Sequence, residues 1–258
     1  MPADRDAPDV LFLDRQVLVL RKPAGMPAQP DATGDPSAAS WCADFLRREQ
    51  NRPDWNPFVA PVHRLDRPVS GLLVLARTSK SADRLTAQFR TRTVHKCYLA
   101  VVSGSPRFDR ADIRLFLKKD SRDNLVEYSP SPFAGAREAL SSLQVIFRGP
   151  DETLVAMLPH TGRSHQLRAT AAFLGHPILG DLKYGADGGL GHWIALHACA
   201  LRFEHPVEHT RLTVRAALPD AWCERFPWFV PWIPGGMLPP RPCAARTRAL
   251  PLESVPSR

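Results

Sequence analysis

The chain of 258 residues has few cysteines, no long hydrophobic run and no internal repeat. Its five cysteines never stand at CxxC spacing and lie mostly among apolar neighbours, which argues against a disulfide scaffold and favours a reducing compartment. We therefore expect a cytoplasmic protein. No charged-then-apolar leader opens the chain and no apolar run approaches the ~20 residues that cross a bilayer, so we expect neither secretion nor a membrane span.

The histidines raise the alternative of a metal-dependent hydrolase. His160 and His165 bracket the stretch HTGRSH, and five more histidines follow: His176, His192, His197, His205 and His209. No pair of them has the HExxH pattern, however, and no cysteine pair has zinc spacing. We therefore expect no metal site.

Positive charge is concentrated in one part of the chain. The net charge is +8, and the segment from Arg77 to Arg122 holds twelve basic and four acidic residues, so it accounts for the whole excess. Such a concentration is typical of proteins that bind a polyanion, because each phosphate they neutralise releases counterions. The alternative is a solvated basic face without a partner.

The hydrophobic pattern predicts many strands and few helices. VLFLDRQVLVLRKPAG (10–25) predicts two short strands joined at Asp14 to Gln16, and apolar spacing after Asp35 and Pro36 predicts a helix. A second helix is expected from Thr78 or Ser79, and a third over 164–174, ended by Gly175. From Lys96 onward strands dominate. We expect an α+β fold with a largely antiparallel mixed sheet flanked by helices.

The domain organisation follows from the same pattern. Residues 10–233 are expected to form one domain, and residues 1–9 a flexible N-terminus. The last 25 residues, 234–258, contain six prolines and almost no periodicity, so we expect them to be disordered.

Three polar side chains stand out as candidates for chemistry. Asp66 lies in VHRLDRPVSGLLVLART (62–78), where Arg64 and Arg67 flank it directly before a run of strand-forming residues. Burial would raise the pKa of such a carboxyl group, and a nearby guanidinium would lower it again. Arg163 stands at the start of the third predicted helix, where a cation opposes the helix dipole and should face an anion. Tyr98 lies on a predicted strand.

Each of these residues also has a purely structural interpretation. Asp66 and its arginines can form a charged loop before a core strand, Arg163 can point into solvent, and Tyr98 can be a core residue. The residues themselves leave these alternatives open.

Five ordered motifs resemble the diagnostic blocks of the RluA-type pseudouridine synthases. They are RKPAGMPAQP, HRLDRPVSG, KCYLAVV, TGRSHQLRATAAFLGHPILGDLKYG and IALHACALRFEHP, and together they span about residues 10 to 220. The resemblance implies the pseudouridine synthase catalytic fold and the conversion of uridine to pseudouridine within structured RNA, ribosomal or transfer. It also implies that no cofactor or metal takes part. We expect a monomer.

The resemblance also assigns roles to individual residues. Asp66 would be the nucleophile, Tyr98 the tyrosine that stacks on the target base, and Arg163 the partner of Asp66. Arg64 would help to displace the target nucleotide from its stack, and Leu196 would pack near the base. The remaining expected contacts with substrate RNA are His63, Leu65, His165, Gln166 and Arg168. Whether the carboxylate attacks the sugar, assists a glycal route or adds to the pyrimidine ring is left open.

The sequence departs from the family pattern in three ways. Val69 stands where the family usually has Thr, and Thr170 stands where His is expected, which affects packing or substrate preference more than catalysis. The small N-terminal RNA-binding domain of some relatives is missing, so we expect the catalytic domain itself to contact RNA. The rival interpretation is an RNA-binding protein that keeps the fold without the activity.

Overall fold

One sheet with helices on both faces makes up the structured part of the chain. The structure is a computed structural model that describes residues 8–120 and 125–232. The predicted disordered tail, residues 234–258, lies outside the described residues, as does most of the predicted flexible N-terminus. None of the helices in the described part is both long and apolar enough to span a bilayer.

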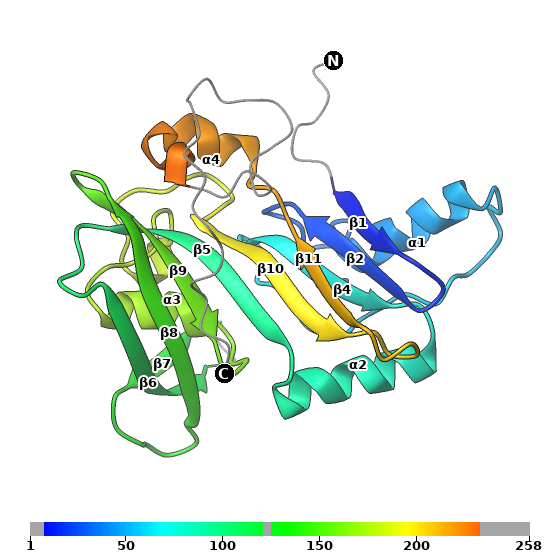
Figure 1. Ribbon diagram of the computed structural model, residues 1–258, viewed down its shortest axis with the longest axis horizontal. Coiled ribbons are helices and arrows are strands. Elements are labelled where there is room, and N and C mark those ends of the chain that lie inside the picture. Colours follow the sequence, from blue (N-terminus) through cyan, green and yellow to red (C-terminus); the bar gives the residue numbers. More distant parts are fainter. Residues whose placement is uncertain (1–7, 121–124, 233–258) are drawn as a thin grey trace.

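The strands form an 11-stranded mixed sheet in the described residues, with the order β1-β2-β4-β10-β5-β9-β8-β6-β7, while β11 pairs with β10 and β3 with β4. Only β4 and β10 run parallel among the described pairings, so the predicted largely antiparallel α+β fold is confirmed (Figure 1). The strands are β1 (Asp9–Leu13), β2 (Val17–Lys22), β3 (Ala60–Pro61), β4 (Ser70–Ala76), β5 (His95–Ser103), β6 (Arg110–Lys119), β7 (Val126–Ser129), β8 (Arg137–Arg148), β9 (Glu152–Pro159), β10 (Leu196–Glu204) and β11 (Arg211–Arg215).

The first hairpin forms where the sequence predicts it. The Oδ1 atom of Asp14 accepts the backbone N–H groups of Gln16 and Val17, each at 2.7 Å, and so closes the turn between β1 and β2. An aspartate side chain can mimic the backbone of a turn in this way. The strand that follows is buried on both faces, which explains its continuous apolar run.

Two helices cover opposite faces of the sheet. In α1 (Ala38–Glu49), Cys42 and Leu46 pack in the same core cluster as Leu18 of β2. In α2 (Ser79–Thr91), Leu85 packs in a second core cluster with Val17 of β2, the neighbour of Leu18 in the strand. Because successive side chains of a strand point to opposite faces, the two helices lie on the two sides of the sheet. α1 is capped by Ser37, which follows Asp35 and Pro36, and α2 is capped by Thr78 as predicted.

The third helix begins two residues later than predicted. α3 (Gln166–Phe173) follows His165, whose backbone is left-handed at φ 50°, and it ends before Gly175 as expected. The two short 3-10 helices are η1 (Leu182–Tyr184) and η2 (Pro227–Trp232), and the sequence predicts neither of them, nor α4 (Asp220–Arg225). The later start of α3 decides which arginine reaches the site described next.

Candidate active site

The loop between β3 and β4 carries Asp66 and is tied to the N-terminal part of the chain. The N–H of Gly25 donates to the carbonyl oxygen of Arg67 at 2.8 Å, and Nε of Arg67 donates back to the carbonyl of Gly25 at 2.9 Å. Nζ of Lys22, which is fully buried, donates to the same Arg67 carbonyl at 3.3 Å. Burial lowers the pKa of Lys22 to about 7, and the nearby charge of Asp66 opposes this shift. These bonds fix the loop beneath Asp66.

His63 anchors the start of the same loop. Its Nε2 atom accepts the N–H of Val74 at 3.0 Å, and its ring stacks on Phe89 with the ring centroids 4.5 Å apart. Burial, assisted by the charge of Lys96, lowers the pKa of His63 to about 3, so the ring is neutral near pH 7. His63 lines the cavity, but its Nε2 is engaged within the protein, so this nitrogen is not free for the RNA contact that the sequence predicts.

Arg168 is the arginine that pairs with Asp66. Its NH1 group donates to Oδ2 of Asp66 at 3.3 Å, while Nε and NH2 donate to the two carboxylate oxygens of Asp181, each at 2.7 Å. The Arg168 and Asp181 side chains are 5% and 1% exposed, and that of Asp66 is 19% exposed. Burial alone would lower the pKa of Arg168, but the hydrogen bonds and charges of Asp181 and Asp66 outweigh it and raise that pKa.

Asp181 therefore aims Arg168 at Asp66. A planar guanidinium that donates two parallel hydrogen bonds to one carboxylate is fixed in orientation. The sequence analysis does not single out Asp181. It lies within the quoted block, in GDLKYG, but only the fold brings it under α3.

The predicted pairing of Arg163 with Asp66 is wrong. Nε of Arg163 donates instead to the carbonyl oxygen of Glu138 on β8 at 2.9 Å. Since α3 begins at Gln166, Arg163 belongs to the preceding turn, where its carbonyl accepts the N–H of Gln166. Its side chain is thereby directed toward β8, and Arg168 in the first helical turn takes the place beside Asp66.

Gln166 holds this turn from inside. Its Oε1 accepts from the Oγ1 of Thr161 at 2.6 Å and from the N–H of Arg163 at 3.1 Å, and its Nε2 donates to Leu140 and Ser141. The side chain is 4% exposed. All of its hydrogen-bonding capacity is used in the protein. Gln166 lines the cavity, but it shapes the turn instead of offering free polar groups to RNA as predicted.

His165 connects Asp66 to a buried tyrosine. Nε2 of His165 lies 3.8 Å from Oδ2 of Asp66, and Nδ1 lies 2.9 Å from the hydroxyl of Tyr184. That hydroxyl accepts the N–H of Val126 at 3.1 Å, so we assign its proton to the bond with Nδ1, which leaves the imidazole proton on Nε2. Burial lowers the pKa of His165 against the opposing charge of Asp66. The ring is neutral and faces Asp66 with an N–H group.

Tyr98 enters the site from β5, where it pairs with Met157 of β9 and Ala198 of β10. Burial is the main cause that raises the pKa of the phenol, and the negative charge of Asp66 adds to it. The hydroxyl therefore keeps its proton at neutral pH. Tyr98 offers an apolar ring and a proton donor beside Asp66, and Leu196 at the start of β10 adds an aliphatic wall.

All ten predicted site residues line one cavity of about 450 Å³. They are His63, Arg64, Leu65, Asp66, Tyr98, Arg163, His165, Gln166, Arg168 and Leu196. The cavity also has lining residues that sequence analysis does not predict as site residues, among them Phe89, Arg90 and Lys96. Of the described lining residues, five are lysine or arginine and one, Asp66, is a carboxylate. This is a concave, positively charged site built around a single acid.

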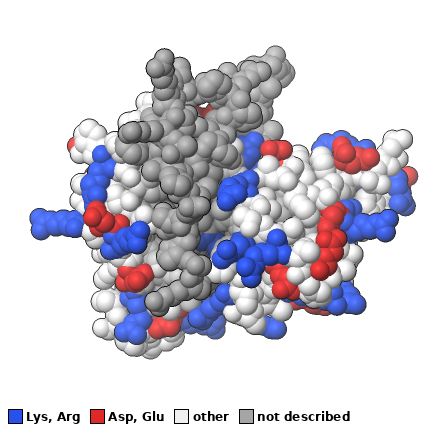
Figure 2. Space-filling model, in the orientation of Figure 1, with Lys and Arg blue, Asp and Glu red and all other residues white. Residues whose placement is uncertain are grey.

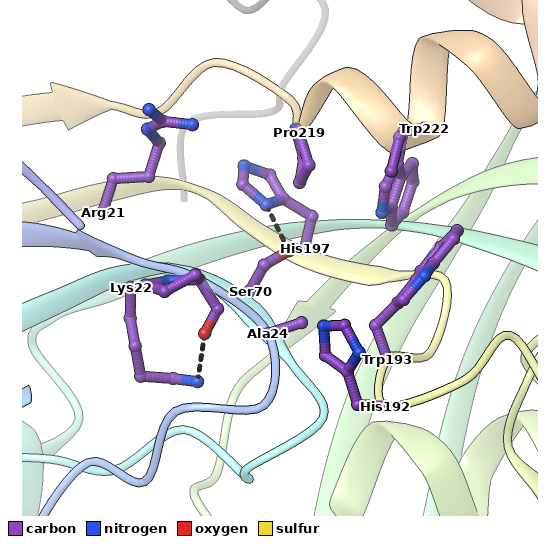
Figure 3. Close-up of a pocket in the computed structure, with 11 residues that line it drawn as sticks. Arg21, Lys22, Ala24, Ser70, His192, Trp193, His197, Pro219 and Trp222 are labelled. Atoms are coloured by element: carbon purple, nitrogen blue, oxygen red, sulfur yellow. Dashed lines mark hydrogen bonds between the residues drawn. The ribbon is translucent and has the colours of Figure 1, made fainter. Parts of the chain in front are cut away.

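A second cavity, drawn in Figure 3, is much smaller. Its volume is about 30 Å³, and Lys22, Ser70, Trp193 and His197 are among the side chains around it. The hydroxyl of Ser70 lies 2.8 Å from Nδ1 of His197, and the two residues pair across β4 and β10. This volume has room for about one water molecule, so a nucleotide has no place here.

Basic side chains outside the cavity are not gathered into one patch on the face drawn in Figure 2, where they are intermingled with acidic ones. Of the eleven cations from Arg77 to Lys119, all of which the structure describes, only Arg90 and Lys96 line the cavity. Others are used structurally: Arg77 donates to the carbonyl of Asp14, and Arg84 to that of Pro206. The basic segment contributes less to the site than its charge predicts.

The two departures from the family pattern are both buried. Val69 is 2% exposed and lines the cavity, while Thr170 is 2% exposed and donates to the carbonyl of Gln166 within α3. Thr170 is not among the residues that line the cavity. Of the two, Val69 is therefore the one that can affect the bound substrate directly.

Three potential metal ligands come together among the described residues, Asp14, His205 and Glu208. Nε2 of His205 already bonds to Asp14 at 2.8 Å, and Nδ1 accepts the N–H of Glu208 at 3.0 Å. Since both ring nitrogens are engaged, the group serves as a turn that closes the β10–β11 end of the sheet. None of the three lines the cavity.

Comparison with known proteins identifies the family. Residues 16–173 match the family described as RNA pseudouridylate synthase. The chain belongs to the RNA pseudouridylate synthase family. It is 34% identical over 208 residues to the dual-specificity RNA pseudouridine synthase RluA of Vibrio parahaemolyticus, and the aligned region covers 78% of this chain and 79% of that protein. It is 32% identical to the tRNA pseudouridine synthase C of Pasteurella multocida, over 84% and 93% of the two chains.

A solved structure shares the fold. The fold matches human RNA pseudouridylate synthase domain containing 4 with a TM-score of 0.68 at 24% identity, over 83% of this chain and 89% of that chain. The protein is thus an RNA pseudouridine synthase, an isomerase, and the cavity around Asp66 holds the residues that the family resemblance assigns to catalysis.

Proposed function

We propose that this synthase isomerises uridines of ribosomal or transfer RNA in the cavity around Asp66, with Asp66 as the nucleophile and Arg168 as its partner. The observation that carries the proposal is the ion pair between Asp66 and Arg168 in a cavity that Tyr98 and Leu196 also line. The names of the similar bacterial proteins include enzymes for ribosomal and for transfer RNA, which supports the substrate class.

The arrangement suits the reaction in three respects. The bond between C1′ and N1 of the nucleotide must break, the uracil must turn while it is held, and C5 must bond to C1′ in place of its proton. Asp66 presents one carboxylate that can act as a nucleophile. Tyr98 and Leu196 offer apolar surfaces for the detached ring, and a protonated phenol cannot compete as a base. The route, through the sugar, a glycal or the ring, stays open.

RNA contacts outside the base fall to the cations of the cavity. Arg64 is exposed beside Asp66, and Arg90, Lys96 and Arg163 complete a basic wall. We assign Arg163 to phosphate, because it has no ion pair with Asp66 and lies near the charges of Arg92 and Arg137. Extruding a base costs a few kcal/mol, which phosphate contacts and stacking can offset.

We also propose that the protein works in the cytoplasm as a monomer. None of the four cysteines that the structure describes forms a disulfide, which fits a reducing compartment. RNA contact comes from the catalytic domain in this proposal.

Asp66→Asn is the direct test of the nucleophile. Amide and carboxylate have the same shape, so we expect release of tritium from carbon-5-labelled uridine in RNA to fall on the order of 10⁴-fold or more. RNA affinity should stay within a few-fold, because Asp66 contacts no phosphate in this proposal. Asp66→Ala serves as the second variant. Full turnover by either variant would exclude Asp66 as the nucleophile.

The same experiment separates the rival function. The wild-type protein is incubated with labelled total RNA from cells that lack this synthase. A protein that only binds RNA would bind this RNA but would release no tritium from it. Pseudouridine mapping in cells with and without the protein then identifies the RNA and the position.

A further inference from the structure

Two free cysteines meet on neighbouring strands beside Tyr98. Cys97 precedes Tyr98 on β5, and Cys199 lies on β10. The pairing of these strands shifts by one residue between Ala198 and Ala200, so Cys199 is the extra residue of a β-bulge. In such a bulge one strand has an extra residue, and here Cys199 lies between Ala198, which pairs with Tyr98, and Ala200, which pairs with Cys97.

The two thiols are in contact. Sγ of Cys199 donates to the carbonyl oxygen of Cys97 at 3.3 Å, and the two side chains are close enough for Cys199 to shift the pKa of the Cys97 thiol. The bond from Cys199 is the main cause that lowers the pKa of Cys97, against the effect of burial, and the same bond and burial raise the pKa of Cys199. Cys97 is partly exposed, whereas Cys199 is fully buried. Cys97 is therefore the more exposed of the two residues and the one whose thiol pKa is lowered, and Cys199 lies on the neighbouring strand.

The other described cysteines are less exposed than Cys97. Cys42 and Cys223 are both buried. Burial raises the pKa of Cys42 to about 12, which makes it an unreactive thiol. The pair on β5 and β10 is thus distinguished by two cysteines on paired strands, one of which is partly exposed.

We propose that Cys97 and Cys199 are an oxidation site, at which peroxide forms a disulfide between β5 and β10 that slows the enzyme. The thiolate of Cys97 attacks one oxygen of hydrogen peroxide, breaks the O–O bond and becomes a sulfenic acid, while the other oxygen leaves as water after it takes up a proton. The sulfur of Cys199 then attacks the sulfur of Cys97, and the hydroxyl leaves as a second water with the thiol proton of Cys199. The sulfurs lose two electrons and the peroxide gains them.

The strand register makes such a bond feasible. Cys199 adjoins Ala200, the residue that pairs with Cys97, so the two cysteines lie on neighbouring strands one position apart in register. A disulfide bridges Cα separations of about 4.4–6.8 Å. The sulfurs must still approach from hydrogen-bonding distance to about 2.05 Å, which pulls the strands together at this level. Tyr98 is the next residue on β5 and pairs with Ala198 next to the bulge. A displacement of about 1 Å in an active site can cost up to ~10²-fold in rate.

The test is oxidation of the full chain with hydrogen peroxide, followed by alkylation, digestion and mass spectrometry. Cys243→Ser serves as the background variant, because Cys243 lies outside the described residues. We expect a crosslinked peptide that joins Cys97 to Cys199, loss of both thiols together, and full alkylation of Cys42 and Cys223 after unfolding. Retention of both thiols, or a sulfenic acid on Cys97 without the crosslink, would overturn the proposal.

The effect on activity is measured on the same samples, and this second part rests on the proposed role of Tyr98. We expect oxidation to lower tritium release by about 10- to 100-fold and a thiol reductant to restore it, and we expect Cys199→Ala to abolish this sensitivity. A crosslinked protein with unchanged activity would refute the effect on catalysis. Because the crosslink is detected without substrate, failure of the disulfide and failure of the proposed function give different results.

Discussion

Arg168 is the residue on which the geometry of the site depends, because it contacts two carboxylates with different surroundings. Asp181 is almost fully buried and takes two of its hydrogen bonds, and Asp66 borders the cavity and takes the third. A guanidinium has several donors in one plane, so it can be fixed by one acid and still act on another. Tyr184 packs against the face of the same guanidinium, 5.0 Å from ring centroid to guanidinium carbon.

Arg168 and Arg163 have different roles in the proposal, and a substitution of each tests this difference. Arg168→Lys replaces the planar group by a point charge that cannot contact Asp66 and both oxygens of Asp181 together. We expect single-turnover rates to fall about 100-fold with RNA affinity changed only a few-fold. Arg163→Ala should instead weaken RNA binding and reduce the salt dependence of log Kd by about one unit of slope, with the rate on saturating RNA nearly unchanged. A large loss of rate in Arg163→Ala together with a loss of RNA affinity in Arg168→Lys would instead make Arg163 the partner of Asp66.

Asp181→Asn tests whether Asp181 positions Arg168. The amide loses the charge and one of the two acceptors, so Arg168 is free to turn away from Asp66. We expect kcat to fall about 10- to 100-fold at unchanged RNA affinity, measured per folded molecule because loss of a buried ion-pair partner also costs about 3–5 kcal/mol of stability. Asp187→Asn, an exposed residue close by in the chain, is the matched control and should change neither quantity. Equal rates for both variants would exclude the positioning role.

At the scale of elements, the parallel contact of β4 with β10 holds the Asp66 loop against the strand that carries Leu196. Gly71 pairs with Ala198 at this contact and has a φ of +116°, which side chains rarely permit. A Cβ atom on Gly71 would lie 2.4 Å from the carbonyl oxygen and 2.5 Å from the nitrogen of Ala198. Only glycine therefore allows the two backbones to approach so closely.

Gly71→Ala should accordingly separate β4 from β10. We expect a loss of about 3 kcal/mol or more in the free energy of unfolding, from backbone strain and overpacking together, measured by urea denaturation. Gly34→Ala is the control for the backbone conformation alone, since φ there is +75° but no atom lies within 4 Å of the added Cβ. If both variants lose the same stability, strain and not the close approach explains the effect.

The elements also show what sequence alone can predict. Strand alternation, the cap at Thr78 and the stop at Gly175 are local properties, and they predict β1, β2, α2 and the end of α3. The start of α3 does not follow from neighbouring residues alone, because it depends on Gln166. The side-chain amide of Gln166 forms hydrogen bonds with residues of β8 and of the preceding turn. The pairing of Asp66 with Arg163 is what the family resemblance implies, and no local pattern at the start of α3 distinguishes Arg163 from Arg168 as the partner.

At the scale of the whole molecule, the distribution of charge along the sequence does not predict which cations line the cavity, whereas the topology of the fold explains it. The densest basic segment of the sequence gives the cavity two cations. The other three are Arg64 in the loop before β4, and Arg163 and Arg168 in the fourth of the five motifs. Residues about a hundred positions apart meet because α3 and the loop before β4 face the same cavity. A charge count can indicate a polyanion, but it cannot say where the polyanion binds.

The stability of the molecule should fall as the pH drops below neutrality, because the fold buries neutral histidines. His197 is fully buried, and burial lowers its pKa from 6.5 to about 3. Between these two pH values the unfolded chain binds a proton that the folded chain does not. The free energy of unfolding therefore increases with pH in this window and decreases as the pH falls from 6.5 to about 3. By linkage, the full effect is on the order of 4 kcal/mol for His197.

Urea denaturation at intervals from pH 7 to pH 5 measures this loss before most carboxylates titrate. His197→Gln keeps an amide near Ser70 but removes the titrating group, so we expect its stability to vary less with pH than that of the unmodified protein over the same interval. His209→Gln, on an exposed histidine, is the control and should keep the original slope. If the slopes of all three proteins coincide, the acid sensitivity has a source other than His197, and a charged imidazole is accommodated at the contact between β4 and β10.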